Sequence, residues 1–273
     1  MPTRLRFSIE IPTPVIAIAG VFAVVPTLAA ASGSEPLPRW PVLPLSRADL
    51  LKHFTHLRGD EKQWWTVATS ALCHEDAKHR DGNIVGLLSA GWKPAQELGG
   101  LALAFTFFGG HIAAVLNSEG RRTQMRNWLT VSSGGLLGEQ LASSFARVWD
   151  SAAPPRSLGG SAGIFALLGV DLCLAAEDLW RLLEQWESVD PEQALGRLAW
   201  LGINISQTVL RVHAERQSIV AGASVSVAHT GHLTGFLWGV GVFIALRWAR
   251  RLRRLRVRQG YGAGPRGRRL GGR

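Results

Sequence analysis

Long uncharged stretches, separated by charged or proline-containing segments, dominate the pattern of hydrophobic and polar positions. The clearest stretches are 11–34, 98–118 and 217–246, and none of them contains Asp, Glu, Lys or Arg. Each is at least as long as the roughly 20 residues that an α-helix needs to cross a bilayer core. Shorter or interrupted apolar runs lie between them, at 84–91, 157–176 and 198–210. The pattern predicts an all-α protein, a polytopic bundle of six transmembrane helices.

The first uncharged stretch allows two interpretations. Val15–Ala31 is rich in Val, Ile and Ala and follows Arg4 and Arg6, as in a first membrane helix with a cytosolic N-terminus. The small residues of Leu28–Gly33 are also typical of the cleavage region of a signal peptide or transit segment. We expect the membrane helix, and the cleaved leader remains the alternative.

Shifts in composition divide the chain into segments. The boundaries that we predict are 1–34 for the N-terminal segment, 35–63 for a loop, 64–246 for a membrane core with an insertion at 119–156, and 247–273 for a basic tail. The loop begins with several prolines, and Pro154-Pro155 end the insertion just before the next apolar run.

The charge of the chain is concentrated at its C-terminal end. The net charge is +10, and eleven arginines fall within residues 247–273, directly after an apolar stretch. This placement is typical of a cytosolic or matrix-facing tail, on the same side as the N-terminus, and it favours anionic lipid headgroups over nucleic acid as the partner. Which membrane holds the protein stays open. Only Cys73 and Cys173 are present, which excludes a disulfide-rich scaffold and a cysteine metal site.

A serine and a histidine in small-residue surroundings are the candidates for chemistry. Ser161 follows Gly159-Gly160 at the start of an apolar run, and His232 follows Gly231 in the last one. Small residues let two membrane helices approach closely, so the two side chains are expected to face each other. A hydroxyl beside an imidazole is the minimum set for nucleophilic acyl chemistry. His229, one helical turn before His232, competes for the role of the base.

The two motifs resemble those of the rhomboid intramembrane serine proteases. Their histidine lies in an H-x-x-G-x-x-x-G pattern, which is complete here as His232, Gly235 and Gly239. Their serine lies in a G-x-S-G motif, and here Ala162 stands in place of its last glycine. The spacing of the first pattern favours His232 over His229 as the base. The resemblance implies a six-helix membrane core of rhomboid type.

A third motif matches the start of the second rhomboid core helix. His74, His79 and Asn83 have the H-x4-H-x3-N spacing of the family, in which the second histidine and the asparagine hold the oxyanion. Positions four apart share a helix face, and preorganised donors stabilise the charge that develops during serine attack. The charged residues within 75–81 place this stretch in the interface or a wet cavity, with the helix proper starting near Gly82.

The resemblance also gives roles to residues around the serine. Phe165 lies one turn from Ser161, where the family often has an aromatic ring stacked on the histidine. Gly159 and Gly235 are expected to form the packing and substrate surface beside it. The implied function is a serine endopeptidase with a Ser161–His232 dyad, which cleaves substrate proteins within or next to transmembrane segments and needs no cofactor or metal.

Two other functions remain as alternatives. The first is a catalytically inactive rhomboid-like protein that binds client membrane helices. It is favoured by Ala162, by the charged stretch at 75–81, and by Thr66 after Trp65, where the family usually has arginine. The second is a small transporter or channel component, which gives no reason for the protease spacing. The long uncharged stretches make a soluble DNA-binding protein the least favoured interpretation.

Overall fold

The computed structural model describes residues 12–57, 63–132, 156–220 and 229–262, which are almost entirely helical. The helices are α1 (Thr13–Val24), α2 (Leu28–Ala31), α3 (Arg47–His53), α4 (Thr66–Thr69), α5 (Ala77–Leu98), α6 (Gly100–Ser132), α8 (Ser161–Glu184), α9 (Pro191–Val220) and α10 (His229–Gly262). Single 3₁₀ turns occur at Ser70–Leu72 and Trp186–Ser188. The described strands are β1 (His56–Leu57) and β2 (Arg156–Ser157), an antiparallel pair. The prediction of an all-α bundle is confirmed.

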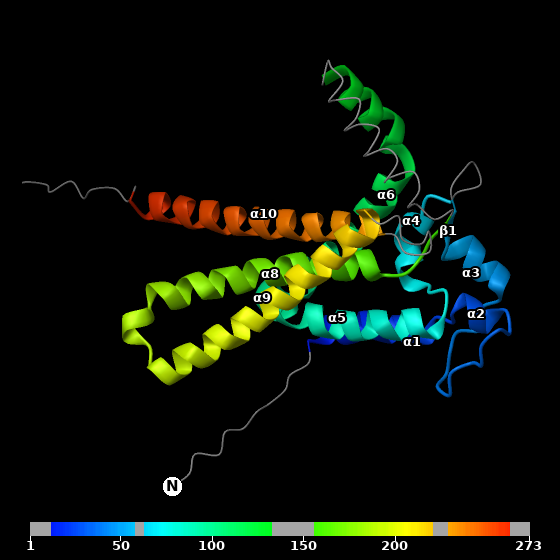
Figure 1. Cartoon of the computed structure of the whole chain (residues 1–273), viewed down its shortest axis with the longest axis horizontal. Helices are drawn as coiled ribbons and strands as arrows, with labels where there is room; N and C mark the ends of the chain where they lie inside the picture. The colour runs from blue at the N-terminus through cyan, green and yellow to red at the C-terminus, as the bar shows by residue number, and fades with distance from the viewer. Residues whose placement is uncertain (1–11, 58–62, 133–155, 221–228, 263–273) are drawn as a thin grey trace, which may run out of the picture.

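Helix α8 lies at the centre of the bundle. It contacts α5, α6, α9 and α10, and it runs alongside α10 across the molecule (Figure 1). Leu167 of α8 and Phe107 of α6 are fully buried in the main hydrophobic core. Val15 and Phe22 of α1 are fully buried in the same core. This packing makes α1 part of the bundle, and the choice between a membrane helix and a cleaved leader stays a prediction.

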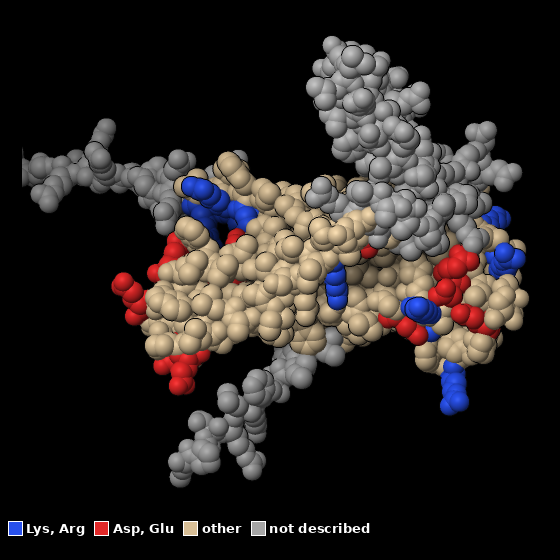
Figure 2. Space-filling model, viewed as in Figure 1, with Lys and Arg blue, Asp and Glu red and all other residues tan. Residues whose placement is uncertain are grey.

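The surface of the bundle is apolar between two charged ends. Figure 2 shows acidic and basic side chains gathered mainly at the two ends of the molecule, with a broad surface of other residues between them. Large apolar side chains on the outer faces of α6, α10 and α9 are strongly exposed, among them Leu101, Leu237 and Trp200. An exposed apolar band of this kind is the surface that lipid covers in an integral membrane protein.

By length and composition, three helical segments among the described residues are apolar enough to cross a membrane. They are Thr13–Ala31, Gly100–Asn117 and His229–Leu255. The other three predicted spans coincide largely with parts of α5, α8 and α9, which have 22, 24 and 30 residues, although α8 begins four residues after the start of the predicted run 157–176. These helices carry more charge, and the count of six spans therefore stays a prediction.

The start of α5 differs from our expectation. The helix begins at Ala77 rather than near Gly82, because Asp76 caps it by accepting a hydrogen bond from the backbone N–H of His79 at 2.7 Å. Its other end also lies beyond the apolar run 84–91, which Lys93 and Pro94 follow in the sequence. Pro94 is buried inside the helix, which continues to Leu98. Tertiary packing thus outweighs the hydrogen bond that the proline removes.

The later helices are longer than the apolar runs that predicted them. Helix α6 continues to Ser132, into the segment that we assigned to an insertion. The short run at 198–210 lies within α9, which extends to Val220. His213 and Glu215 follow the apolar run, where its end at 210 predicts a loop, and they are helical instead. Apolar runs mark only the part of a helix that faces an apolar medium, whereas its charged ends continue into the headgroup region.

Helices α8 and α10 approach each other through backbone contacts at glycine. A methyl group at Gly235 would overlap the carbonyl oxygen of Ala162, and one at Gly239 would overlap that of Ala166. Gly241, on the same helix, has open space where a side chain would begin. Glycine is therefore required at the first two positions and dispensable at the third.

This contrast predicts opposite effects of one substitution at two sites. Gly239→Ala is expected to destabilise the bundle by about 1–3 kcal/mol, because α10 must move away from α8. Gly241→Ala is expected to leave the stability unchanged or to raise it by about 0.5–1 kcal/mol, since alanine stabilises a helix interior relative to glycine. The midpoint of thermal unfolding in detergent micelles measures both effects. Equal midpoints for the two variants would contradict the packing described here.

Candidate active site

The crossing of α8 and α10 brings Ser161 and His232 together. The Oγ atom of Ser161 lies 2.8 Å from Nε2 of His232, at hydrogen-bonding distance. Ser161 is the first residue of α8, and His232 lies in the first turn of α10. His232 is buried, with 7% of its surface exposed. When the ring carries its proton on Nδ1, Nε2 accepts the hydrogen bond of the serine hydroxyl, which is the arrangement of a nucleophile and its general base.

A glycine turn places the serine at the start of its helix. Gly159 has φ of +91°, a backbone conformation that residues with a side chain rarely adopt. Its N–H donates to the carbonyl oxygen of Ser70 at 2.8 Å, and the carbonyl oxygen of Gly160 accepts from the N–H of Ile164. The turn is thereby tied to the segment that precedes α5.

Phe165 fixes the orientation of the histidine ring. The two rings are parallel, with an interplanar angle of 2° and centroids 4.5 Å apart. Phe165 is one turn after Ser161, so both residues lie on the face of α8 that meets α10. Ring stacking of this kind contributes about 0.5–1.5 kcal/mol beyond apolar burial. The imidazole is therefore held edge-on to the serine hydroxyl.

His79 and Asn83 face the same turn from α5. A methyl group at Gly159 would lie 2.6 Å from Cε1 of His79 and 3.5 Å from Nδ2 of Asn83. Asn83 is buried, and its Nδ2 group has no hydrogen-bond partner among the described residues. A buried donor without a partner is costly unless a ligand or water satisfies it. The site thus contains a donor that is available to a bound oxygen atom.

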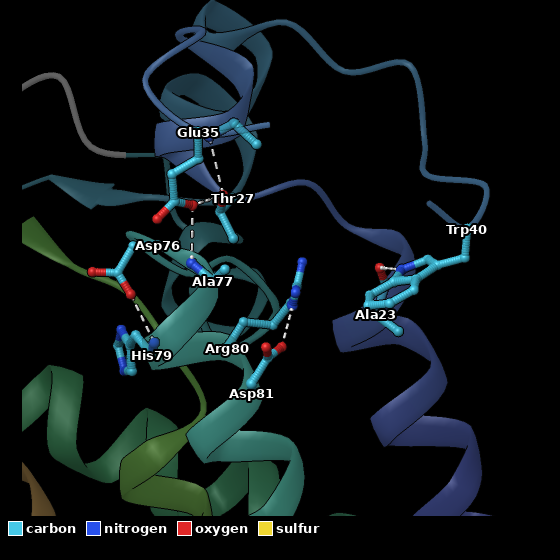
Figure 3. Close-up of polar contacts among 10 residues, drawn as sticks. Ala23, Thr27, Glu35, Trp40, Asp76, Ala77, His79, Arg80 and Asp81 are labelled. Atoms are coloured by element: carbon cyan, nitrogen blue, oxygen red, sulfur yellow. Dashed lines mark hydrogen bonds and ion pairs between the residues drawn. The ribbon is translucent and has the colours of Figure 1, made fainter. Parts of the chain in front are cut away.

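Carboxylates hold the first turn of α5 in place (Figure 3). The Asp76 side chain accepts from the backbone N–H of His79, as described above. Oε2 of Glu35 accepts from the backbone N–H of Ala77 at 3.1 Å. Negative groups at a helix N-terminus satisfy its free N–H groups and its dipole. The loop before α3 thereby anchors the helix end that carries His79.

The structure adds a carboxylate that the sequence did not reveal. Oε2 of Glu215, on α9, lies 2.5 Å from Nδ1 of His229 and 3.0 Å from Nδ1 of His232. The ligand atoms of these three residues lie within 4.8 Å of one another, a set that is able to hold a metal ion. The only signal in the sequence is a carboxylate shortly before a charge-free stretch with two histidines, and that spacing alone does not indicate contact.

Two other polar residues, His111 and Thr66, form hydrogen bonds that have no part in the site. His111 is buried, and its Nε2 lies 2.9 Å from the Oγ atom of Ser70, as in a histidine that has a structural role. Thr66, where the resemblance leads one to expect arginine, donates from Oγ1 to the carbonyl oxygen of Gln63 at 2.5 Å. The run Gly134–Gly138 is glycine-rich like a phosphate-binding loop but lacks its lysine, and it lies outside the described residues.

The roles that the sequence assigned to the site residues stay predictions, although the geometry is compatible with each. The structure brings together Ser161, His232 and Phe165 by direct contact, and it places His79 and Asn83 against Gly159. Gly235 packs under the backbone next to the serine, as described above.

Comparison with known proteins gives the family. A family model described as Rhomboid domain matches residues 61–249, which is more than half of the chain. Neither the curated proteins nor the solved structures gave a match. The matched range contains both apolar motifs and the α5 motif. The chain therefore belongs to the Rhomboid family, whose members are integral membrane proteins built as polytopic helical bundles.

Proposed function

We propose that this protein is an intramembrane serine endopeptidase that cleaves substrate proteins within or next to their transmembrane segments. The observation that carries the proposal is the distance of 2.8 Å between the Oγ atom of Ser161 and Nε2 of His232. The two residues come from separate helices, and the ring is stacked on Phe165. Such a pair is a nucleophile with its base, held in one geometry.

The reaction follows from this geometry in two steps. Nε2 of His232 takes the hydroxyl proton of Ser161 while Oγ attacks the scissile carbonyl carbon. The tetrahedral intermediate collapses to an acyl-enzyme when His232 returns the proton to the leaving amine. Water, deprotonated by the same nitrogen, then releases the acyl group. Both steps use only groups of the protein and one water molecule, so the mechanism as proposed calls for no metal or cofactor.

The oxyanion is stabilised by donors that converge beside the serine. We assign this role to Nδ2 of Asn83, the His79 ring and the backbone N–H of Ser161. Asn83 supports the assignment most directly, because its donor is buried and has no partner among the described residues. Donors that are fixed before the reaction stabilise the developing charge without the cost of reorganisation.

Substrates of such a site are transmembrane proteins with an unstable helix. A scissile peptide bond must be extended to meet Ser161, and the free amides of an extended chain have no partners in lipid. A substrate segment that leaves the helical state readily, at the edge of the bilayer or next to a helix-breaking residue, meets this requirement.

The C-terminal end of α10 supports an orientation in the membrane. Arg250, Arg251, Arg253 and Arg254 are exposed beyond the apolar part of the helix. Arginines at such a position favour the cytosolic or matrix side and attract anionic lipid headgroups. We place both termini on that side.

A second candidate is an inactive rhomboid-like protein that binds client helices. It is favoured by Ala162 beside the serine, where the active family motif has glycine, and by Thr66. Both departures lie at or near the elements that form the site, and the contact between Ser161 and His232 argues for the protease. The labelling experiment that follows separates the two functions.

Active-site labelling with a fluorophosphonate tests the nucleophile. Detergent-solubilised wild-type protein is expected to be labelled, and Ser161→Ala and His232→Ala are expected to lose labelling, because the first removes the nucleophile and the second removes its base. Ser89→Ala and His213→Ala are matched controls at exposed positions and should label like the wild type.

The outcomes separate the candidate functions. Equal labelling in all variants would remove Ser161 as the nucleophile. No labelling of folded wild-type protein would favour the inactive, client-binding protein.

The oxyanion assignment predicts the effect of removing one donor. Asn83→Ala is expected to lower the second-order rate of fluorophosphonate labelling by about 10²–10³-fold, since one donor to the oxyanion is lost. Asn204→Ala, at a half-buried position on α9 where the amide donates to the Trp200 carbonyl oxygen, is the control. A change of less than about 3-fold for Asn83→Ala would contradict the assignment; a typical donor contributes far more.

A further inference from the structure

We infer that Glu215 is a positioning residue for His232, so that the site works as a Ser–His–Glu triad in which His229 anchors the carboxylate. The inference rests on the proposed function, because it assigns a task to Glu215 in the same reaction. It begins from the contacts of one carboxylate oxygen with two buried histidines on another helix.

The ring of His232 uses both of its nitrogen atoms in this arrangement. Nε2 accepts from the serine hydroxyl only when the ring proton is on Nδ1. Nδ1 is buried and lies 3.0 Å from Oε2 of Glu215, although its N–H is not aligned for a good hydrogen bond. Catalytic hydrogen bonds are often poorly aligned without substrate and tighten in the complex. The nearby carboxylate favours the tautomer that the base requires.

His229 holds the same carboxylate oxygen. Its Nδ1 lies 2.5 Å from the same oxygen of Glu215, and the two side chains have only 11% and 16% of their surface exposed. A short contact with a charged acceptor is among the stronger hydrogen bonds in proteins. His229 and His232 are almost one turn apart on α10, so both face α9. The carboxylate is thus fixed at the position where it meets His232.

The charges balance through the chemical step. The serine proton moves to Nε2, the Oγ–carbon bond forms, and the carbonyl π electrons become the oxyanion. His232 is then a cation whose Nδ1–H faces the Glu215 carboxylate. Glu215 keeps its negative charge and takes no proton. The acid of a serine protease triad behaves in the same way. An ion pair that forms during the reaction in a poorly solvated site lowers the barrier more than it would in water.

The distances favour direct contact over a shared metal ion. In a tetrahedral zinc site, ligand atoms at about 2.0–2.2 Å from the metal are separated by roughly 3.3 Å. The separation of 2.5 Å between Nδ1 of His229 and Oε2 of Glu215 is shorter than that. A hydrogen-bonded carboxylate therefore fits this group better than a metal centre, and the test includes the metal as an outcome.

The first test is Glu215→Gln, which keeps the size of the side chain and removes its charge. We expect the rate of fluorophosphonate labelling to fall by about 10²-fold or more, with kcat on a cleaved transmembrane substrate falling alike and KM nearly unchanged. Glu215→Asp should recover part of the loss because it restores the charge. Glu192→Gln, the same change at an exposed position of the same helix, is the control.

A second measurement does not depend on activity. Ring ¹⁵N shifts in histidine-labelled protein distinguish a protonated nitrogen from an unprotonated one, and His232→Asn identifies the resonances of His232. Wild-type protein should carry the His232 proton mainly on Nδ1, and Glu215→Gln should shift a substantial share to Nε2. This result supports the inference about Glu215 even if labelling shows that the protein is no protease.

Three outcomes would overturn the inference. One is an unchanged tautomer of His232 in folded Glu215→Gln. Another is a labelling rate in that variant within about 2-fold of the wild type, in protein whose unfolding midpoint is also unchanged. The third is the presence of about one equivalent of zinc in purified wild-type protein and its absence from Glu215→Gln. This result would make Glu215, His229 and His232 a metal site.

Discussion

The close approach of α8 and α10 is the constraint on which the site depends. The side chains of Ser161 and His232 form a hydrogen bond only if the backbones of the two helices lie very close together. The backbones come this close where Gly235 and Gly239 lie against the carbonyl oxygens of α8. The membrane supplies little hydrophobic driving force between helices, so this contact depends on small residues and close packing. The same glycines that appear in the histidine motif are thus the structural reason for the distance of 2.8 Å between the hydroxyl and the imidazole.

Every other part of the site is positioned relative to that crossing. Phe165 uses the same face of α8 to hold the ring, and the turn at Gly159 ties the serine to the segment before α5. Helix α5 is fixed in turn by the carboxylates of Asp76 and Glu35 at its first residues. The site therefore lies at helix ends, where backbone N–H groups are free and polar side chains are tolerated.

Much of the architecture and the main contact of the site were predictable from the sequence, because both rest on local patterns. Apolar runs located the helices, and the spacing of the glycines indicated which helix faces meet. The ends of the helices were not predictable in the same way. Helix α5 passes Pro94 and ends beyond Lys93, which pairs with Asp178 of α8 at 2.7 Å. Such tertiary contacts are not visible in the local pattern of the sequence. Glu215 was missed because it lies beyond the apolar run of α9, and only the packing of α9 against α10 brings it to His232.

The distribution of polar groups over several helices follows from the chemistry that we propose. Proton transfer from a serine to a histidine creates a negative oxygen and a positive ring at the same time, and a poorly solvated site stabilises neither charge by itself. In this proposal, α5 provides donors for the negative oxygen, and α9 provides a carboxylate for the positive ring. Helices α8 and α10 hold the reacting serine and histidine. A bundle with fixed crossings keeps these groups in place before the substrate arrives, so that little reorganisation is needed during the reaction. On this argument, the rigidity of the helix contacts is itself part of the catalytic machinery.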